Sequence, residues 1–323
     1  MVSAIIINYN GGDDLLRCLE SCASQREVSE IIVVDNASSD DSVDRAARGT
    51  PGTQFVRNAD NRGFACAANQ GVALATCHVV LFLNPDVRLE PGCARELAAA
   101  LARRPGVAGP ATLLEATGEL HAGETLNHLG FPRTLAAGET GPLWVQGCAL
   151  ATTRSTFERL GGFDERYFMF IEDMDYCWRV LLAGGDVTVP AAARAVHAGG
   201  GSAPGGYARE GAMRTSSLRL VSRHRYTLAM LVKCAPAAWL PLIVPLHIGK
   251  TLATAAAALA LRHPGTAREL VATIGWNARQ LPESLRRRRA VPRVRSGRKA
   301  ARERVGWGFY ELAFLRRGVP SLD

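Results

Sequence analysis

The segment Val79-Val80-Leu81-Phe82-Leu83-Asn84-Pro85-Asp86 is an apolar run that ends abruptly in polar residues. A short apolar run bounded by turn residues is typical of a strand that is buried on both faces. The turn itself has two interpretations, because Pro85 fixes the backbone and Asp86 can either cap the next segment or face a site. An acid at the mouth of a buried strand is costly without a partner, so we expect Asp86 to face a site.

The first half of the chain repeats this pattern, because short β-branched runs alternate with helical periodicity. Such alternation predicts an α/β fold with a mostly parallel sheet and flanking helices. The predicted strands are residues 2–7, 30–34, 54–57 and 78–83, and the predicted helices are residues 13–23, 41–48, 63–75 and 93–103. Ligands of such sheets bind beyond the carboxyl ends of the strands, so residues 8–10, 35–40 and 84–86 are the first candidates for a site.

Charge divides the chain into two units. Residues 1–215 carry 18 Arg, no Lys and 25 acids, whereas residues 216–323 carry 20 basic residues and 5 acids. The 323 residues, 47% of them hydrophobic, exceed one average domain, and we predict a boundary at residue 215. An acidic body joined to a strongly basic, helical tail indicates that the tail meets a membrane face or nucleic acid.

The eight cysteines form no CxxC pair and lie within apolar or helical patterns. Met1 runs into a strand-like segment without the basic region or the cleavage site of a signal peptide. Both features favour reduced thiols in a cytoplasmic protein. The sequence also contains neither GxxxxGK[ST] nor a strand-linked GxGxxG, which argues against a P-loop enzyme and against the usual dinucleotide fingerprint.

The predicted strand ends offer groups suited to a nucleotide. Tyr9 can place an aromatic face beside a base, and Asp35 can accept a hydrogen bond from a base or a ribose hydroxyl. Asp86 can hold Mg²⁺ or Mn²⁺ on a diphosphate, since hard cations take oxygen ligands. Residues 187–190 predict a further short strand, and His197 after it, at a strand end and before a glycine run, is a candidate second ligand. Turn-forming acids and amides and a structural histidine are the alternative explanations.

The segment 163–179 places several acids among aromatic residues. As a helix that begins near Glu172, it sends Asp173 and Asp175 to different faces. One acid can then face a cleft while another braces the helix. A helix N-terminus that is enriched in carboxylates because of its dipole explains the same residues.

Taken in order, these pieces resemble glycosyltransferase family 2, the inverting sugar-nucleotide transferases with a GT-A fold, and most closely its rhamnosyltransferase-like branch. The resemblance spans roughly residues 2–205. It rests on residues 3–10, 34–40, 61–65 with Asn69 and Gly71, 83–86, 147–153, 161–165, 172–175 and 197–202. One departure is Asn84, which stands at the first acidic position of the DxD motif.

The resemblance implies a GT-A catalytic domain that moves a sugar, rhamnose first among the candidates, from a dTDP- or UDP-linked donor to a hydroxyl of a glycan or lipid-linked acceptor. It implies metal-assisted single displacement with Mg²⁺ or Mn²⁺ on Asp86 and His197, and Asp173 as the catalytic base beside Glu172. Donor contacts are implied for Tyr9, Asn10, Asp35, Asn36, Asn61, Gly63, Asn69 and Asn84. Asp164 and Trp144 are assigned to the acceptor side, and residues 105–145 are expected to be a loop-rich insertion there.

Residues 226–261 are strongly apolar, yet two lysines, three prolines and a histidine interrupt them. No run reaches the roughly 20 uninterrupted apolar residues of a spanning helix. The segment is therefore either an in-plane or re-entrant membrane segment or a helical subdomain on the catalytic body. The arginine-rich stretch 286–304 suits anionic lipids, so we predict peripheral association with the inner face of the cell membrane. Solvated charge on a helix face is the alternative.

Other function classes stay open. A nucleic-acid-binding protein would use the basic tail, but residues 286–304 lack interleaved aromatics, so no nucleic-acid partner is predicted. A non-catalytic nucleotide-sugar-binding protein would not need Asp86, Asp173 and His197 together. Within the enzyme class, a polyprenyl-phosphate sugar transferase is the alternative, because a lipid acceptor also suits the apolar tail.

Overall fold

A mixed seven-stranded sheet forms the centre of the protein, in the order β12-β6-β11-β4-β1-β2-β3. The computed structural model describes residues 1–127, 130, 132–135, 139, 141–199, 205–209, 212–306 and 321–322. The strands of this sheet are β1 Val2–Asn8, β2 Val28–Asp35, β3 Gln54–Arg57, β4 Val79–Leu83, β6 Gly106–Ala108, β11 Ala149–Thr153 and β12 Asp186–Thr188. β1, β2, β3 and β4 run parallel to one another, and β11 runs antiparallel between β4 and β6. The predicted α/β fold is confirmed.

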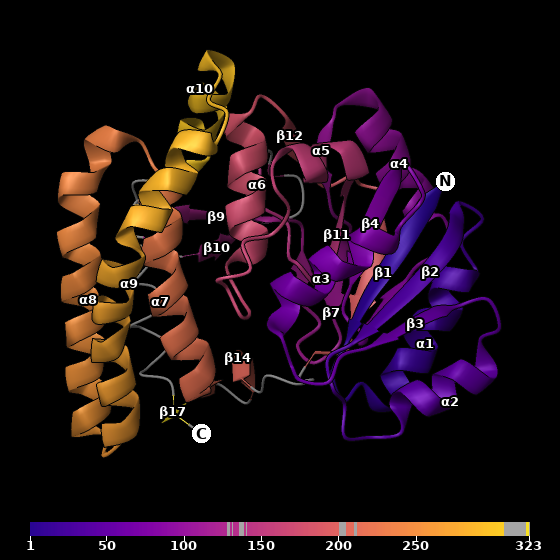
Figure 1. Cartoon of the computed structure of the whole chain (residues 1–323), viewed down its shortest axis with the longest axis horizontal. Helices are drawn as coiled ribbons and strands as arrows, with labels where there is room; N and C mark the ends of the chain where they lie inside the picture. The colour runs from indigo at the N-terminus through magenta and orange to yellow at the C-terminus, as the bar shows by residue number, and fades with distance from the viewer. Residues whose placement is uncertain are drawn as a thin grey trace.

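Helices cover both faces of this sheet (Figure 1). The helices α1 Gly12–Ala23, α2 Ser42–Gly49 and α4 Cys93–Arg103 pack on one face. The helices α3 Gly63–Leu74, α5 Arg154–Arg159 and α6 Glu172–Leu182 pack on the other. Successive residues of a strand point to opposite faces, so Ile5 joins one core and Ile6 the other. Burial on both faces explains why these strands read as apolar runs.

The segment 105–145 differs from the loop-rich insertion that its composition predicts. Besides β6 it contains the short strands β7 Ala111–Leu114, β8 Leu120–His121, β9 Glu124–Asn127 and β10 Pro132–Thr134. β7 and β8 join a second sheet with β5 Val87–Leu89 and β13 Arg194–His197, in the order β5-β13-β7-β8. In this sheet β13 pairs antiparallel with β5, and the pairing places His197 opposite Val87, the residue after Asp86. β6, β7 and β9 each pair with a strand from a distant part of the chain, which composition does not reveal.

The helices after residue 215 form the basic end of the molecule. They are α7 Ser217–Cys234, η1 Ala237–Trp239, α8 Leu240–Ala260, α9 Pro264–Ala290 and α10 Arg295–Glu303. Figure 1 shows α7 between the sheet domain and the outer helices α8 and α9. Tyr226, Met230 and Leu231 of α7 share one apolar core with Met174 and Trp178 of α6. The two charge-defined halves of the chain are therefore packed around a common core.

Remaining short strands lie at the edges of this arrangement. They are β14 Gly205–Arg209, β15 Ala212–Thr215, β16 Val305–Gly306 and β17 Ser321–Leu322. β16 pairs with β9, so the chain directly after α10 joins the small sheet of β9 and β10. The glycine run that comes after His197 in the sequence continues into residues 200–202, which lie outside the described residues.

One stretch in the described part of the chain, Ala237–Ala260, is long and apolar enough to cross a membrane, with a mean hydropathy of 1.5 and 28% of it buried. It passes this test although His247 and Lys250 interrupt it, because the apolar residues around them dominate the average. Length and composition do not distinguish a spanning helix from one that lies against protein or in a membrane surface.

A buried ion network fastens α7 to the sheet domain. The Nζ atom of Lys233 lies 2.8 Å from Oδ1 of Asp175 and also pairs with Asp164. Nε of Arg179 lies 2.8 Å from the other oxygen of Asp175, and Nη2 of Arg166 lies 2.7 Å from Asp164. Lys233 is 1% exposed, so it bridges two carboxylates in the protein interior. The pKa of Asp164 is depressed although burial alone would raise it, because Arg166 and Lys233 favour its charged form.

We expect Lys233→Met to lower the free energy of unfolding by about 3–5 kcal/mol, because it leaves buried carboxylates without their shared cation. Urea denaturation measures this loss. The matched control is Lys299→Met, since Lys299 is 78% exposed and pairs only loosely with Glu303 at 3.8 Å. The control should change stability by less than about 1 kcal/mol. Equal effects of the two variants would contradict a structural role for the network.

Candidate functional site

A cavity of about 340 Å³ lies beyond the carboxyl ends of β1 and β4, where the N-terminal turn of α6 and one face of α7 complete its wall. Most of the residues that the sequence predicts for a site line this cavity. They are Tyr9, Asn10, Asn36, Asn61, Gly63, Asn84, Asp86, Trp144, Glu172, Asp173 and His197. Segments separated by more than a hundred residues thus meet around one space.

Asp86 and His197 form a close pair in this wall. Nε2 of His197 lies 3.2 Å from Oδ2 of Asp86, and both side chains are about nine-tenths buried. The amide of Ala198 donates a hydrogen bond of 3.0 Å to the carbonyl oxygen of Asp86, which fixes the two segments side by side. The Nδ1 atom of His197 is buried and has no hydrogen-bond partner in the described structure.

This pair fits a divalent cation that a substrate helps to bind. No group of three or more His, Cys, Asp or Glu side chains with metal-site geometry occurs among the described residues. A cation here would therefore take two protein ligands and complete its shell with phosphate oxygens and water, as Mg²⁺ commonly does. Burial lowers the pKa of His197, but Cys148 and Asp86 outweigh it and raise that pKa to about 11. A bound cation would reverse this preference, because it requires a neutral imidazole.

Asp173 presents a carboxylate to the same cavity from the first turn of α6. Its Oδ2 accepts a hydrogen bond of 2.7 Å from the amide of Gly147, and its Oδ1 accepts one of 2.7 Å from the amide of Met174. Burial raises the pKa of Asp173 to about 6, and these two hydrogen bonds limit the rise. Such a carboxylate is ionised at neutral pH yet is a stronger base than an exposed aspartate.

Glu172 has the opposite character although it is the adjacent residue. It is 6% exposed, and its Oε2 atom is buried without a hydrogen-bond partner among the described residues. Burial, reinforced by the charge of Asp173, raises the pKa of Glu172 well above its ordinary value. The two adjacent carboxyls therefore differ in their surroundings, since Asp173 accepts two backbone hydrogen bonds and Glu172 has an orphaned oxygen. Asp175, on another face of α6, points into the ion network, so the predicted divergence of Asp173 and Asp175 is present.

The turn that leads into α6 is held in a rare backbone conformation. Phe170 and Ile171 both have positive φ values, 67° and 71°, which is costly for a β-branched residue such as Ile. The amide of Phe64 donates a hydrogen bond of 2.7 Å to the carbonyl oxygen of Phe168 and clamps the turn. Gly63 permits this approach, because a Cβ atom there would lie 2.2 Å from the same oxygen.

The loops after β1 and β2 form another part of the cavity wall, and hydrogen bonds connect these two loops to each other. The amide of Asn10 donates to Ser38 Oγ at 2.8 Å, and the amide of Ser39 donates to Asn10 Oδ1 at 2.8 Å. Asn36 donates to the carbonyl oxygen of Gly63 at 3.1 Å. Tyr9 and Asn10 are thereby presented by a fixed loop.

Three predicted site residues do not line this cavity. Asp35 accepts hydrogen bonds from Asn8 and from Ser38, which orients the loop that carries Asn36. Asn69 bonds to the backbone of Phe163 through both its oxygen and its nitrogen. Asp164 is 1% exposed and belongs to the ion network. Each of these side chains has polar partners within the fold.

Among the cavity residues that were not anticipated are two arginines, Arg219 and Arg223 of α7. The guanidinium carbon of Arg219 lies 4.9 Å from the ring centroid of Phe170, so it rests on the turn before α6. Arg223 lies near enough to Asp173 to favour its charged form and lower its pKa. Their four-residue spacing places both on one helix face. That spacing was the one feature of the sequence that could have indicated a shared role for the two arginines, but both residues come after the last motif of the family resemblance.

Comparison with known proteins agrees with this architecture. The model of the family described as "Glycosyl transferase family 2" matches residues 3–161. An N-acetylglucosaminyl-diphospho-decaprenol L-rhamnosyltransferase from Mycobacterium tuberculosis is 30% identical over 230 residues, which cover 59% of this chain and 74% of that protein.

Two solved structures share the fold. GalNAc-T7 with UDP, GalNAc and Mn²⁺ superposes with a TM-score of 0.58 at 16% identity, over 72% of this chain and 48% of the other. The mannosyltransferase PcManGT from Pyrobaculum calidifontis, in complex with GDP-Man and Mn²⁺, gives 0.53 at 18% identity, over 94% and 86%. At these identities the likeness concerns the fold alone, and this chain spans about half the length of GalNAc-T7.

We expect Gly63→Ala to destabilise the protein by roughly 2–4 kcal/mol, since it adds a backbone clash at Phe168 to the cost of a positive φ. The matched control is Gly52→Ala, because Gly52 also has a positive φ, 94°, but nothing lies within 4 Å of its Cβ position. The control should cost only about 1 kcal/mol. Chemical denaturation of both variants measures the difference, and equal losses would refute the clamp on this turn.

Proposed function

The chain belongs to glycosyl transferase family 2 and is a glycosyltransferase, and from this premise we propose that it moves a sugar from a nucleotide-sugar donor to an acceptor hydroxyl by single displacement with inversion. The observation that carries the proposal is the shared cavity, which gathers a candidate base, Asp173, with the Asp86–His197 pair. A base and a leaving-group site in one enclosed space are what a direct displacement requires.

The donor lies, in this proposal, along the loops after β1 and β2. Tyr9 supplies an aromatic face for the base, while Asn10, Asn36 and Asn61 supply amide donors and acceptors to its polar atoms. Asp35 supports these loops through its bonds to Asn8 and Ser38. We propose a dTDP-linked rhamnose as the first candidate donor and a UDP-linked sugar as the second, and the rhamnosyltransferase relative supports rhamnose.

Asp86 and His197 would hold Mg²⁺ or Mn²⁺, which when bound neutralises charge on the departing diphosphate. Arg219 and Arg223 add fixed positive charge to the wall of the same cavity. Guanidinium groups suit phosphate oxygens because they donate two parallel hydrogen bonds. Because Asn84 stands where the motif has an acid, the cation site carries one negative charge instead of two. We propose that Arg219 and Arg223 neutralise part of the remaining charge of the diphosphate.

Asp173 is the proposed base. An acceptor hydroxyl has a pKa far above neutrality, so a positioned carboxylate must take its proton as the new bond forms. The amides of Gly147 and Met174 hold the carboxylate of Asp173 in one orientation. Burial raises the pKa of the neighbouring Glu172 well above its ordinary value and so disfavours a second negative charge beside Asp173. Trp144, which lines the cavity, is the proposed apolar surface on the acceptor side.

A lipid-linked glycan is the proposed acceptor. The rhamnosyltransferase relative, whose name specifies a diphospho-decaprenol acceptor, supports this choice. The basic helices after residue 215 and the apolar stretch Ala237–Ala260 support a cytoplasmic protein at the inner, anionic face of a cell membrane.

We expect Asp173→Asn to lower the transfer rate about 10²- to 10⁴-fold while donor affinity stays near wild type, because only proton removal is lost. The control is Asp41→Asn, an exposed aspartate that does not line the cavity, which should retain activity. Transfer assays and calorimetry measure the two quantities. Near-wild-type turnover in Asp173→Asn would exclude it as the base.

The transfer activity should also fall at acidic pH. Asp173 must be ionised to accept a proton, and its pKa is raised to about 6. We therefore expect kcat/KM to rise with pH through about 6 and to level off above it. A profile that is flat between pH 5 and pH 7 would contradict this assignment.

The donor class is tested by thermal shift against dTDP, UDP, GDP and their sugars, each with and without Mn²⁺ or Mg²⁺. A ligand that binds the native state adds about 2.7 kcal/mol of stability at a hundredfold excess over its Kd. We expect one nucleotide to give a metal-dependent shift that Asp86→Ala abolishes and Asp41→Ala preserves. A shift of equal size in Asp86→Ala would remove Asp86 from the cation site.

A further inference from the structure

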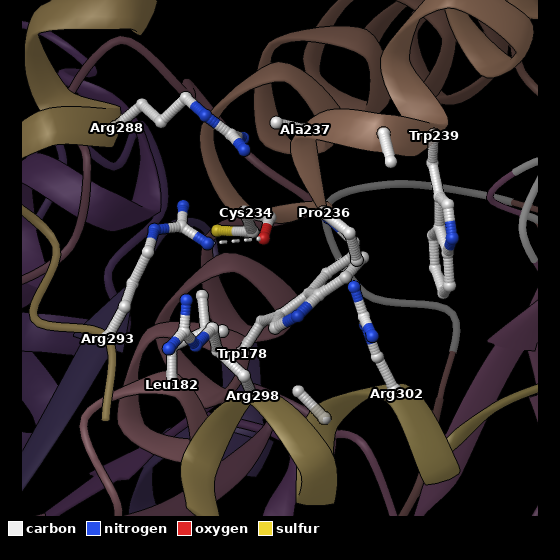
Figure 2. A pocket seen from close by; sticks show the side chains of 12 residues that line it. Trp178, Leu182, Cys234, Pro236, Ala237, Trp239, Arg288, Arg293, Arg298 and Arg302 are labelled. Atoms are coloured by element: carbon white, nitrogen blue, oxygen red, sulfur yellow. Dashed lines mark hydrogen bonds between the residues drawn. The ribbon is translucent and has the colours of Figure 1, made fainter. Parts of the chain in front are cut away.

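A second cavity of about 290 Å³ lies among α6, α7, α9, α10 and the turn that begins α8. Its apolar wall comes from Trp178, Leu182, Pro236, Ala238 and Trp239. Figure 2 shows Arg298 and Arg302 reaching from one helix toward Trp178, with Arg288 and Arg293 near Cys234 on the other side. None of the 12 described residues that line it is acidic. The cavity thus combines an apolar interior with four guanidinium groups.

Two of these arginines have a structural role. Nη1 of Arg288 donates to the carbonyl oxygens of Val232 at 2.8 Å and Ala235 at 2.7 Å, and Nη1 of Arg293 donates to that of Cys234 at 3.1 Å. They cap the C-terminal carbonyls of α7, where cations are favoured. Burial lowers the pKa of both groups, and neighbouring guanidinium charge lowers each further.

The other two arginines have no such role. Arg298 and Arg302 stand one turn apart on α10, and both are exposed. Neither side chain forms an ion pair or a hydrogen bond with any described residue. Capping therefore explains Arg288 and Arg293 but leaves Arg298 and Arg302 unexplained. Four cations around one cavity without a carboxylate favour a bound anion.

The surroundings indicate which kind of anion this is. Ala237, Ala238 and Trp239, which line the cavity, begin the apolar stretch Ala237–Ala260. Along it Leu242, at 54%, and Leu246, at 43%, are exposed. Apolar surface therefore continues from the cavity along α8. A free inorganic anion would make no use of it, whereas a phosphate attached to a hydrocarbon chain would.

We propose that this cavity binds the phosphate head group of an anionic membrane lipid, with the hydrocarbon part of that lipid lying along the start of α8. The exposed side chains of Arg298 and Arg302 donate hydrogen bonds to the phosphate, while the less exposed Arg288 and Arg293 contribute positive charge on the inner side of the cavity. The inference rests on the proposed membrane association and is separate from the transfer reaction.

The lipid cavity contacts the second half of α6, through Trp178 and Leu182, whereas the cavity that holds Asp173 contacts its first turn. Leu182, the last residue of α6, lines the lipid cavity, whereas Asp173 lies in its first turn. Trp178 lies five residues after Asp173 and Leu182 lies nine residues after it, which is about 8 to 14 Å at 1.5 Å per residue. The two cavities are therefore distinct, and in this proposal the lipid is an anchor and not the group that receives the sugar.

Isothermal titration calorimetry of the full chain with dihexanoyl phosphatidic acid, below its micelle concentration, tests the proposal. Arg298→Gln/Arg302→Gln should weaken binding by roughly tenfold or more, because charge-assisted hydrogen bonds contribute about that much each. Ala238→Trp should weaken it similarly by filling the cavity, without a change in charge. The control is Arg289→Gln/Arg295→Gln, which removes the same charge from exposed positions outside the cavity and should bind as wild type.

Inorganic phosphate and hexanoate serve as partial probes, and each should bind at least tenfold more weakly than the lipid. Equal lipid affinity in wild type and in Arg298→Gln/Arg302→Gln would overturn the proposal. So would an equal loss in the control, which would indicate general charge attraction, or inorganic phosphate binding as tightly as the lipid. The transfer reaction is tested separately, with a soluble acceptor and without lipid. A negative result for lipid binding therefore does not contradict the proposed transfer reaction.

Discussion

The ammonium group of Lys233, buried between Asp164 and Asp175, is the constraint on which the rest of the structure depends. Asp175 lies two residues after Asp173, so the position of α6 in the core fixes where the carboxylate of Asp173 meets the cavity. Lys233 is also the penultimate residue of α7, and its position sets the register that brings Arg219 and Arg223 to the same cavity. One ion network thus aligns residues from both charge-defined halves of the chain.

Local pattern was sufficient for strands β1 to β4 and most helices, because their information lies within a few positions. It also placed Tyr9 and Asp86 at strand ends, and both line the cavity. It could not show that Asp35 and Asp164 bind other residues of the fold instead of lining the cavity, since the type of a polar residue does not identify its partner. Within residues 105–145, β6, β7 and β9 pair with strands from distant segments, and composition does not contain that information. Arg219 and Arg223 were missed because their place in the cavity depends on how α7 docks.

Adjacent carboxyls at the start of α6 have different properties because of their surroundings alone. Glu172 is buried with an oxygen that has no hydrogen-bond partner among the described residues, whereas Asp173 accepts hydrogen bonds from two amides. The strained turn at Phe170 and Ile171 produces this difference, since it sets the direction in which the helix begins. Backbone strain held by the Gly63 contact is thus linked to the chemistry of one carboxylate.

The position of Lys233 in the chain also affects synthesis on the ribosome. Asp164 and Asp175 emerge well before their shared cation, and α7 comes after the whole sheet domain. Domains generally fold as units, N-terminal first. Here the first 215 residues cannot complete their core until α7 has been made, so the nascent sheet domain must wait in an incomplete state, with acidic groups and apolar surface uncovered. The time until α7 has been made and can pack therefore sets how long the incomplete sheet domain is exposed to chaperones and proteases.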